Sequence, residues 1–261
     1  MKVGPKMKKE MYSSEITILR DTFRRLLRRH AKTNIVKLID KTHPADLALI
    51  FRYFNDTEQD SIFSSMSASE ETVEFLNELD ESITTRLIEN ETPNRLAEIL
   101  EEASSNEQAY LMGLIDGKFA ASVIELLQVE EQEELEEMMA YPEDSAGILM
   151  HTDVFTLHED TKAREAIYAL QDQEEAEMVF YLYTLDDDGR LTGVISLRDL
   201  VTTHGDTMLK DIMSKNIQAV RPETDQEEVA RIVSQYNFLA VPVVDSDEQL
   251  LGIVTVDNVV D

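Results

Sequence analysis

Carboxylates are the side chains of this chain that offer most for chemistry. Asp and Glu number 53 against 24 Lys and Arg, which gives a formal net charge of −29 over 261 residues. Clustered carboxylates bind hard divalent cations, because such cations prefer oxygen ligands over those of His or Cys. Paired carboxylates can also act as the acid and the base of a hydrolase. Cation binding and acid–base catalysis are therefore the two chemistries to weigh.

Other reactive groups are sparse. The chain has no cysteine, which excludes a disulfide scaffold, a thiolate zinc site and a cysteine nucleophile. The five histidines are scattered, and no nucleophile elbow, phosphate-binding glycine loop or histidine metal spacing occurs. We therefore do not expect an enzyme. So strong an acid excess also makes a poor nucleic-acid binder, because phosphate contacts need Lys and Arg.

The sequence contains no stretch that is apolar enough to span a membrane. The longest apolar runs, such as residues 238–244, hold about seven residues, whereas a spanning helix needs about 20. The first residues are too polar for a secretory signal. The sequence as it stands predicts a soluble intracellular chain.

The charge is unevenly distributed. Residues 1–32 carry ten Lys and Arg against three Asp and Glu, a net of +7, and the remainder of the chain has a net of −36. Apolar residues recur at helical spacing in this segment, and four arginines flank them: Ile16, Leu19, Phe23, Leu26 and Leu27, with Arg24, Arg25, Arg28 and Arg29. The pattern predicts a basic amphipathic arm that either docks on an acidic neighbour or contacts anionic lipid.

Residues 33–140 predict a helical domain. Gly and Pro are scarce there, and apolar residues recur at i, i+3 and i+4. Pro44 and Pro93 suit the first turns of two helices, with Thr92 as a cap. The segment around Pro44 resembles the segment around Pro93 at an offset of 49 residues. This repetition predicts short helices stacked into a superhelix.

The pattern of apolar and polar residues changes after Pro142. Strand-like runs then alternate with helical runs, and the order strand, helix, strand, strand, helix occurs twice. The predicted strands cover residues 178–185, 191–197, 238–244 and 250–256, and the predicted helices cover residues 163–171 and 226–236. We therefore divide this half into a linker with a first module, residues 141–205, and a second module, residues 206–261.

Two motifs recur at a fixed order in this half. Residues 193–199 (GVISLRD) match residues 252–258 (GIVTVDN), and residues 150–157 match residues 213–220. The region resembles a tandem pair of CBS domains, which implies a repeated βαββα fold. Ser196 and Thr255 suit helix N-caps, and an acid in the following turn is stabilised by the helix N-terminus. In the CBS family that acid commonly meets the ribose of an adenosine ligand, and the alternative is a purely structural cap.

The segment that connects the two halves of the chain makes the family resemblance more specific. Residues 141–150 (YPEDSAGILM), the helical repeat before them and residues 224–231 (TDQEEVAR) resemble MgtE-type magnesium channels over residues 33–261. The resemblance implies an all-α superhelical domain followed by a tandem CBS pair, an α plus α/β fold. It also implies a homodimer formed through the CBS domains, a transmembrane pore after Asp261, and a location at the cytoplasmic face of the membrane.

In that family, Mg²⁺ bridges acids of the helical and CBS domains and closes the pore. The resemblance therefore implies a set of metal-facing positions: Asn94, Glu98 and Glu102 on one helical face, and Asp225, Glu227, Asp257, Asn258 and Asp261 in the second module. Asn94, Asn237 and Asn258 are neutral where acids are expected, and Asp257 beside Asn258 can compensate. For each acid, the alternative is a solvated surface group.

An adenine nucleotide, ATP or another, is the second ligand that the resemblance implies. The matching positions are Tyr181, Arg198, Asp199 and Phe238. An aromatic ring can stack on a base, Arg can meet phosphate and Asp can bind ribose hydroxyls. The alternative for the two rings is a position in the core or at an interface. The alternative function is an adenosine-nucleotide sensor whose acids serve only solubility.

Overall fold

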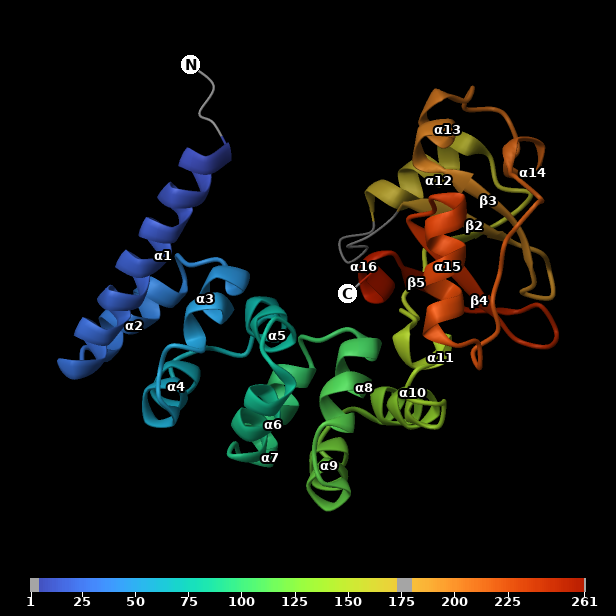
Figure 1. Cartoon of the computed structure of the whole chain (residues 1–261). Helices are drawn as coiled ribbons and strands as arrows, with labels where there is room; N and C mark the ends of the chain where they lie inside the picture. Colours follow the sequence, from blue (N-terminus) through green and yellow to red (C-terminus); the bar gives the residue numbers. More distant parts are fainter. Residues whose placement is uncertain (1–4, 173–179, 261) are drawn as a thin grey trace. The chain divides into compact units, whose positions relative to one another are not determined.

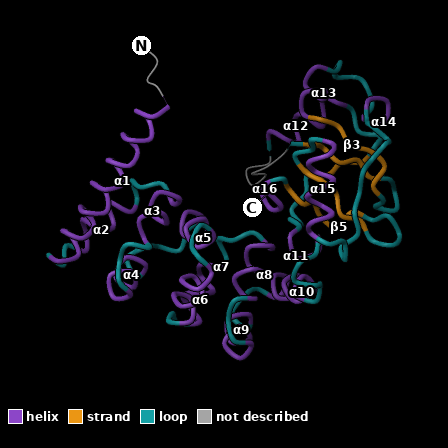
Figure 2. The backbone as a smooth tube through the Cα atoms, in the orientation of Figure 1, coloured by secondary structure: helices purple, strands orange, loops and turns teal. Residues whose placement is uncertain are grey.

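Short helices follow one another through the first half of the chain, and small sheets with flanking helices make up the second half (Figure 1). The computed structural model describes the backbone of residues 5–172 and 180–260. The chain divides into two units, Met1–Gln132 and Glu133–Asp261. The expected order, an all-α region followed by repeated strand and helix modules, is confirmed (Figure 2).

The first half is helical, as the sequence predicts. Its helices are α1 (Pro5–Arg28), α2 (Lys32–Ile39), α3 (Pro44–Phe51), α4 (Asp56–Phe63), α5 (Glu70–Asn77), α6 (Glu81–Glu89), α7 (Pro93–Leu100), α8 (Ser105–Gly113), α9 (Gly117–Ile124) and α10 (Val129–Met139). Within residues 5–172 and 180–260, no helix combines the length and the apolar character that crossing a bilayer requires.

The 49-residue repeat is visible in the helix starts. Pro44 and Pro93 occupy the first turns of α3 and α7. The Thr92 hydroxyl accepts a hydrogen bond from the Arg95 nitrogen at 3.4 Å, which confirms that cap. The following helices repeat as well, because α4, α5 and α6 recur as α8, α9 and α10. The repeated unit is thus four helices, each of which is too short to be stable as an isolated helix in water.

A finer repeat lies inside this one. Three buried polar side chains each donate a hydrogen bond to the carbonyl oxygen eight residues earlier, near the end of the preceding helix. They are Gln59 to Phe51 at 3.0 Å, Thr84 to Leu76 at 3.0 Å and Gln108 to Leu100 at 2.8 Å. Each of these carbonyl oxygens also accepts a backbone N–H hydrogen bond from the residue three positions later, so the side chain adds a second bond that ties the next helix to the end of the preceding one. The structural unit is therefore a helical hairpin.

The basic arm docks on the first hairpin. Phe23 is fully buried, and its ring meets that of Phe54 edge to face with centroids 6.2 Å apart. The Arg24 guanidinium donates to the Tyr53 carbonyl oxygen at 2.5 Å, and that of Arg20 lies 5.7 Å from the Tyr53 ring centroid. Docking is thus observed for the inner face of α1. These contacts are aromatic and to backbone oxygen, whereas the sequence predicted docking on carboxylates.

The second unit has the predicted order of elements. They are α11 (Ala146–Leu149), β1 (Thr156–His158), α12 (Ala163–Gln171), β2 (Tyr181–Leu185), β3 (Leu191–Ser196), α13 (Leu197–Thr202), α14 (Leu209–Ile212), α15 (Gln226–Tyr236), β4 (Ala240–Val244), β5 (Leu250–Thr255) and α16 (Asp257–Val260). The helices α12 and α15 match their predicted ranges. The predicted strand start at residues 178–179 lies outside the described residues.

The two modules differ in their first strand. In the first module, β1 pairs parallel with β2, and β2 pairs antiparallel with β3. In the second, β4 pairs with β5, and the opening strand is reduced to a bridge between Val220 and Val243. Pro222 lies two residues further on, and because proline has no N–H group it cannot continue the ladder. A core of small and aliphatic residues, including Leu182, fills the first module.

Candidate nucleotide and metal sites

Tyr181 lies where three of the predicted nucleotide-binding segments meet. It opens β2 and pairs in antiparallel register with Ser196, the residue that precedes α13 and its Arg198 and Asp199. The Tyr181 hydroxyl accepts a hydrogen bond from the Leu239 nitrogen at 3.4 Å, and Leu239 follows Phe238. The structure therefore brings Tyr181, the start of α13 and the Phe238 segment together, although they are distant in sequence.

Asp199 is held by the cap that the sequence predicts. The Ser196 hydroxyl accepts from the Asp199 nitrogen at 3.1 Å and donates to Oδ2 of the same aspartate at 2.7 Å. The other carboxylate oxygen, Oδ1, has no hydrogen bond within the described residues, and both Arg198 and Asp199 are exposed. Among described side chains Arg198 forms no ion pair. An unpaired guanidinium beside an exposed carboxylate suits a phosphorylated sugar.

Phe238 is not a core residue. Its ring stacks on Tyr236 with centroids 5.4 Å apart and an interplanar angle of 15°, and the Tyr236 side chain is 46% exposed. Between them Asn237 ends α15 in the left-handed conformation, with φ of 54°. Asparagine tolerates that conformation better than most residues do. Sequence reasoning missed Tyr236, although its spacing from Phe238 was visible.

The second module repeats the cap with an amide. The Thr255 hydroxyl hydrogen-bonds to Oδ1 of Asn258, as Ser196 does with Asp199. The same Oδ1 lies 3.2 Å from Nε2 of His151, and the Asn258 amide nitrogen donates to the Leu149 carbonyl oxygen at 3.4 Å. The carbonyl oxygen predicted to face a metal ion is therefore engaged within the unit.

The three metal-facing candidates of the first unit are all exposed. Asn94 and Glu98 lie four residues apart on α7, on one face, as predicted. Glu102 does not extend that face as the sequence predicted, because α7 ends at Leu100 and Glu102 lies in the following turn. The chain turns there to reach the next hairpin. Glu98 is thus the carboxylate that the helix itself presents.

The candidates of the second unit have mixed roles. Asp225 is the N-cap of α15, and its carboxylate accepts from the Glu227 nitrogen at 2.8 Å. Glu227 and Asp257 are exposed, and Asp257 opens α16. Asp261 lies outside the described residues. Within residues 5–172 and 180–260, no group of three or more His, Asp or Glu side chains is placed to hold a metal ion.

A groove that the sequence did not predict opens in the second unit. Its volume is about 880 Å³, and its walls are formed by Glu137, Ala140, Tyr141, Pro142, Arg221, Pro222, Glu223, Asp245, Ser246 and Leu251. Burial, then the charges of Glu137, Glu223 and Asp245, raise the pKa of Tyr141. Its ring packs against Gly147, where an added Cβ atom would lie 2.5 Å from ring carbons. A side chain at position 147 would therefore displace the Tyr141 ring.

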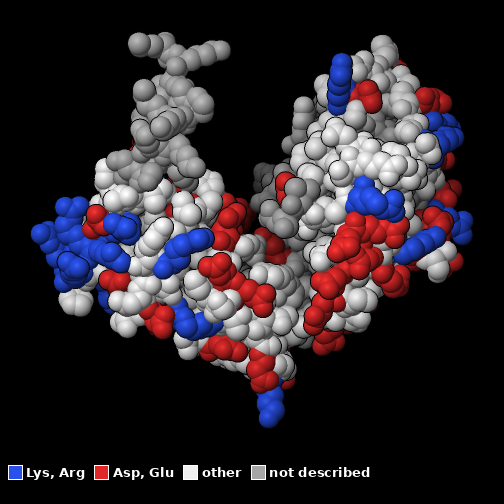
Figure 3. Space-filling view, viewed as in Figure 1, with Lys and Arg blue, Asp and Glu red and all other residues white. Residues whose placement is uncertain are grey.

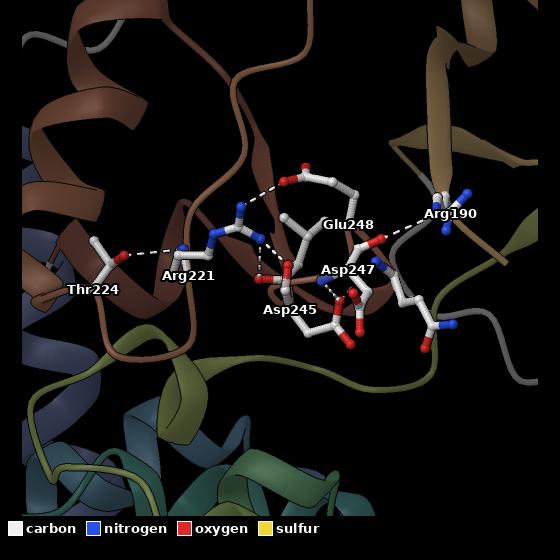
Figure 4. Close-up of polar contacts among 8 residues, drawn as sticks. Arg190, Arg221, Thr224, Asp245, Asp247 and Glu248 are labelled. Carbon is white, nitrogen blue, oxygen red and sulfur yellow. Dashed lines mark hydrogen bonds and ion pairs between the residues drawn. The ribbon is translucent and has the colours of Figure 1, made fainter. Parts of the chain in front are cut away.

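Arginines fix the wall of this groove (Figure 4). Arg221 donates to the Asp245 carbonyl oxygen and, at 2.5 Å, to the Glu248 carboxylate. Arg190, from the turn of the first module, donates to the Asp247 carbonyl oxygen at 3.2 Å. The β4–β5 turn is therefore held by one arginine from each module, and the two modules are joined at this end.

A helical repeat domain joined to two βαββα modules defines a class of regulatory protein with tandem CBS domains. Residues 145–204 and 209–261 match the CBS domain family, and residues 42–144 match the family described as the MgtE intracellular N domain. Together these matches extend from residue 42 to residue 261, with a gap at residues 205–208. The chain belongs to the MgtE family, and it comprises the helical N domain and the CBS pair.

Known relatives agree with this assignment. A solved structure of the cytosolic domain of the Mg²⁺ channel MgtE, in complex with ATP, is 31% identical with a TM-score of 0.87, covering 93% of this chain and 99% of that one. The magnesium transporter MgtE of Enterococcus faecalis is 42% identical over 133 residues, 51% of this chain and 29% of that protein. The magnesium transporter MgtE of Thermus thermophilus is 38% identical over 167 residues, which are 64% of this chain and 35% of that protein.

The chain spans about a third of the length of these two curated relatives, 29% and 35%. Both relatives are magnesium transporters, which agrees with the expectation that the chain is not an enzyme.

Proposed function

We propose that this chain is the Mg²⁺-sensing regulatory region of a magnesium transporter, at the cytoplasmic face of a membrane. The transmembrane pore would follow this region, and it would close when Mg²⁺ binds acids of the helical domain and of the CBS pair. The observation that carries the proposal is the likeness to the cytosolic domain of a Mg²⁺ channel over 93% of this chain. The acid excess of the chain supports it.

The physical basis is mutual repulsion between carboxylates. Two like charges about 4 Å apart repel by roughly 4 kcal/mol at an effective dielectric constant of about 20. Several such pairs disfavour a compact arrangement until cations neutralise them. Mg²⁺ suits this role because it keeps most of its waters and can bridge oxygens weakly. Binding of several ions makes compaction depend steeply on Mg²⁺ concentration.

The acids proposed for this role are exposed and free of ion pairs within the described residues. They are Glu98, Asp225, Glu227 and Asp257, with Glu102 in the turn after α7. Asp261, which lies outside the described residues, completes the proposed set. Asn94, on the same face of α7 as Glu98, would offer an uncharged carbonyl oxygen beside that carboxylate. We leave out Asn258, because its carbonyl oxygen is engaged by Thr255 and His151.

An adenine nucleotide is the second ligand that we propose. Tyr181 and Phe238, which are both half-buried, would contact the base, and Asp199 would contact the ribose. The exposed Arg198, which has no ion pair among the described residues, would bind the phosphates. The ATP complex of the related cytosolic domain supports this ligand. A nucleotide sensor without a metal role remains the alternative function.

We further propose that the chain forms a homodimer through its CBS pair. Tyr168 on α12 and Val201 on α13 are 64% and 68% exposed. Large apolar side chains exposed on neighbouring helices are typical of a protein interface. The elements α12 and α13 contact each other, so the two side chains belong to one part of the surface.

The proposal is tested by following the radius of gyration by small-angle X-ray scattering during a Mg²⁺ titration. We expect compaction at millimolar Mg²⁺ beyond that seen in sodium chloride of matched ionic strength. Equal compaction in the two salts would contradict Mg²⁺ sensing. Calorimetry with ATP, ADP and AMP on the same sample identifies the alternative, because a nucleotide sensor would bind at least one of them without responding to Mg²⁺.

A further inference from the structure

A concentrated group of cations lies at the corner between α1 and α2. We call Arg25, Arg28, Arg29, Lys32 and Lys37 the basic corner. All five side chains are exposed, and none forms an ion pair within the described part of the chain. Figure 3 shows Lys and Arg gathered at this end of the first unit, whereas Asp and Glu are spread over the rest of the visible surface. The net charge of the chain is −29, so five neighbouring cations without an ion pair need a physical explanation.

The stabilisation of helix ends by charged side chains explains the presence of only some of these cations. Arg25 and Arg28 in the last turn of α1 stabilise the helix C-terminus. The next helix begins at once, however, and its first turn has no acid, while its N-cap Ala31 makes no side-chain cap hydrogen bond. A cation such as Lys32 at a helix N-terminus is unfavourable. The fold itself therefore does not account for the basic corner, and an anionic partner would.

The outward face of α1 adds an apolar element. Ile18 is 63% exposed, and Arg25 and Arg29 follow it by seven and eleven residues, close to whole helical turns. Phe23 on the opposite face is fully buried, and its ring meets that of Phe54. The exposed stripe of α1 thus combines an aliphatic side chain with cations, while the docked face holds the helix in place.

We propose that the basic corner, together with Ile18, binds the anionic headgroup surface of a lipid bilayer. Cations near such a surface are attracted to acidic lipid, and an aliphatic side chain among them can enter the headgroup boundary. An acidic protein surface would satisfy the cations but would leave Ile18 without a favourable contact. The acid excess elsewhere does not prevent this contact, because exposed charges are screened beyond about 10 Å at 0.1 M salt.

This proposal is independent of Mg²⁺ sensing, and it is tested on the whole chain by cosedimentation with vesicles. We expect binding to phosphatidylcholine vesicles that contain roughly one-third phosphatidylglycerol, and none to phosphatidylcholine alone. The double variant Arg28→Gln and Arg29→Gln should bind roughly 25-fold more weakly, because each cation contributes about fivefold.

Matched variants separate the basic corner from overall charge. Lys118→Gln with Lys215→Gln removes two exposed cations elsewhere and should leave vesicle binding unchanged. Ile18→Gln should weaken binding, whereas Val129→Gln, at a side chain of nearly equal exposure, should not. Thermal melting confirms that each variant is folded, which these exposed positions favour.

Three results would overturn the proposal. The first is equal sedimentation with anionic and neutral vesicles, and the second is undiminished binding by the Arg28→Gln, Arg29→Gln variant. The third is an absence of vesicle binding together with low-salt self-association that the same double variant abolishes in analytical ultracentrifugation. That last result would assign the basic corner to an acidic protein surface, here a second copy of the chain.

Discussion

The Tyr181 hydroxyl lies 3.4 Å from the backbone nitrogen of Leu239, and this hydrogen bond joins the first CBS module to the second. Tyr181 opens β2, and Leu239 immediately precedes β4. The bond is long, so its contribution to stability is small. The ring and the hydroxyl of Tyr181 can therefore be separated by substitution, and each has a different expected effect on nucleotide binding.

Tyr181→Ala should weaken ATP binding roughly tenfold, because stacking of a base on an aromatic ring contributes about 1–3 kcal/mol. Tyr181→Phe keeps the ring and should stay within about threefold of the wild type, since only a long hydrogen bond is lost. Isothermal titration calorimetry measures both. Tyr110→Ala in the first unit is the control and should not change ATP binding. Equal loss in the Phe and Ala variants would contradict a stacking role.

Asp199→Asn separates ligand binding from helix capping. The amide keeps the shape of the side chain and leaves the Ser196 cap on the Asp199 nitrogen in place. We expect roughly tenfold weaker ATP binding with an unchanged melting temperature, because charge-assisted bonds to sugar hydroxyls are about twice as strong as neutral ones. Ser196→Ala should instead lower the free energy of unfolding by about 1 kcal/mol. If Asp199→Asn destabilises the fold equally, its role is structural.

Removing charge from three proposed metal-facing acids should shift the Mg²⁺ response. The variant Glu98→Gln, Asp225→Asn, Glu227→Gln keeps side-chain size, and Asn at position 225 preserves the N-cap. The Mg²⁺ concentration at half compaction should rise roughly tenfold, taking about 0.5 kcal/mol for each exposed carboxylate. Small-angle scattering provides the midpoint.

The matched control neutralises three other exposed acids, Glu125→Gln, Glu133→Gln and Glu136→Gln. It changes the net charge by the same amount. If this control shifts the midpoint as far as the first variant does, the response depends on total charge, and specific sites are not supported.

Gly147→Ala tests the packing of the groove wall. The added Cβ atom would lie 2.5 Å from the Tyr141 ring, so the ring must move. We expect a loss of about 1–3 kcal/mol in the free energy of unfolding, measured by urea denaturation. Gly113→Ala, with no atom within 4 Å, is the control and should cost nothing. Combining Gly147→Ala with Tyr141→Ala should cost less than the two single losses together, because the clash is removed.

Local patterns predicted more of the fold than of the sites. The helices α12 and α15 match their predicted ranges, because their apolar spacing and their caps are local. The finer hairpin repeat was not predicted, since Thr84 takes the role in the middle hairpin that Gln59 and Gln108 take in the hairpins on either side. A match between different polar residues is invisible to a sequence comparison.

The site contacts that were not predicted are tertiary. Leu239 follows Tyr181 by 58 residues, and Asn258 follows His151 by 107. Neither helical nor strand periodicity carries information over such distances. The sequence could therefore name Asn258 as an oxygen donor, but only the fold shows where that oxygen is engaged.

Tyr183 offers a prediction of increased stability. Its side chain is 1% exposed in the core between the two modules, and its hydroxyl has no hydrogen-bond partner among the described residues. A buried unpaired hydroxyl costs about 1–3 kcal/mol in protein mutational data. Tyr183→Phe should therefore raise the free energy of unfolding by about 1 kcal/mol and the melting temperature by a few degrees. Tyr53→Phe, at a side chain that is 51% exposed, should leave both unchanged.

The same variant has a pH dependence with a definite sign. Burial, then the neighbouring Tyr181, raise the pKa of Tyr183 in the folded protein. Above pH about 10 the unfolded chain can ionise this tyrosine whereas the folded chain cannot, so the wild type loses stability as the pH rises. Tyr183→Phe has no such group, and its advantage over the wild type should widen between pH about 9 and 11 in denaturation experiments. A constant difference across that range would mean that the hydroxyl has a partner, such as an internal water, that keeps its folded pKa close to normal.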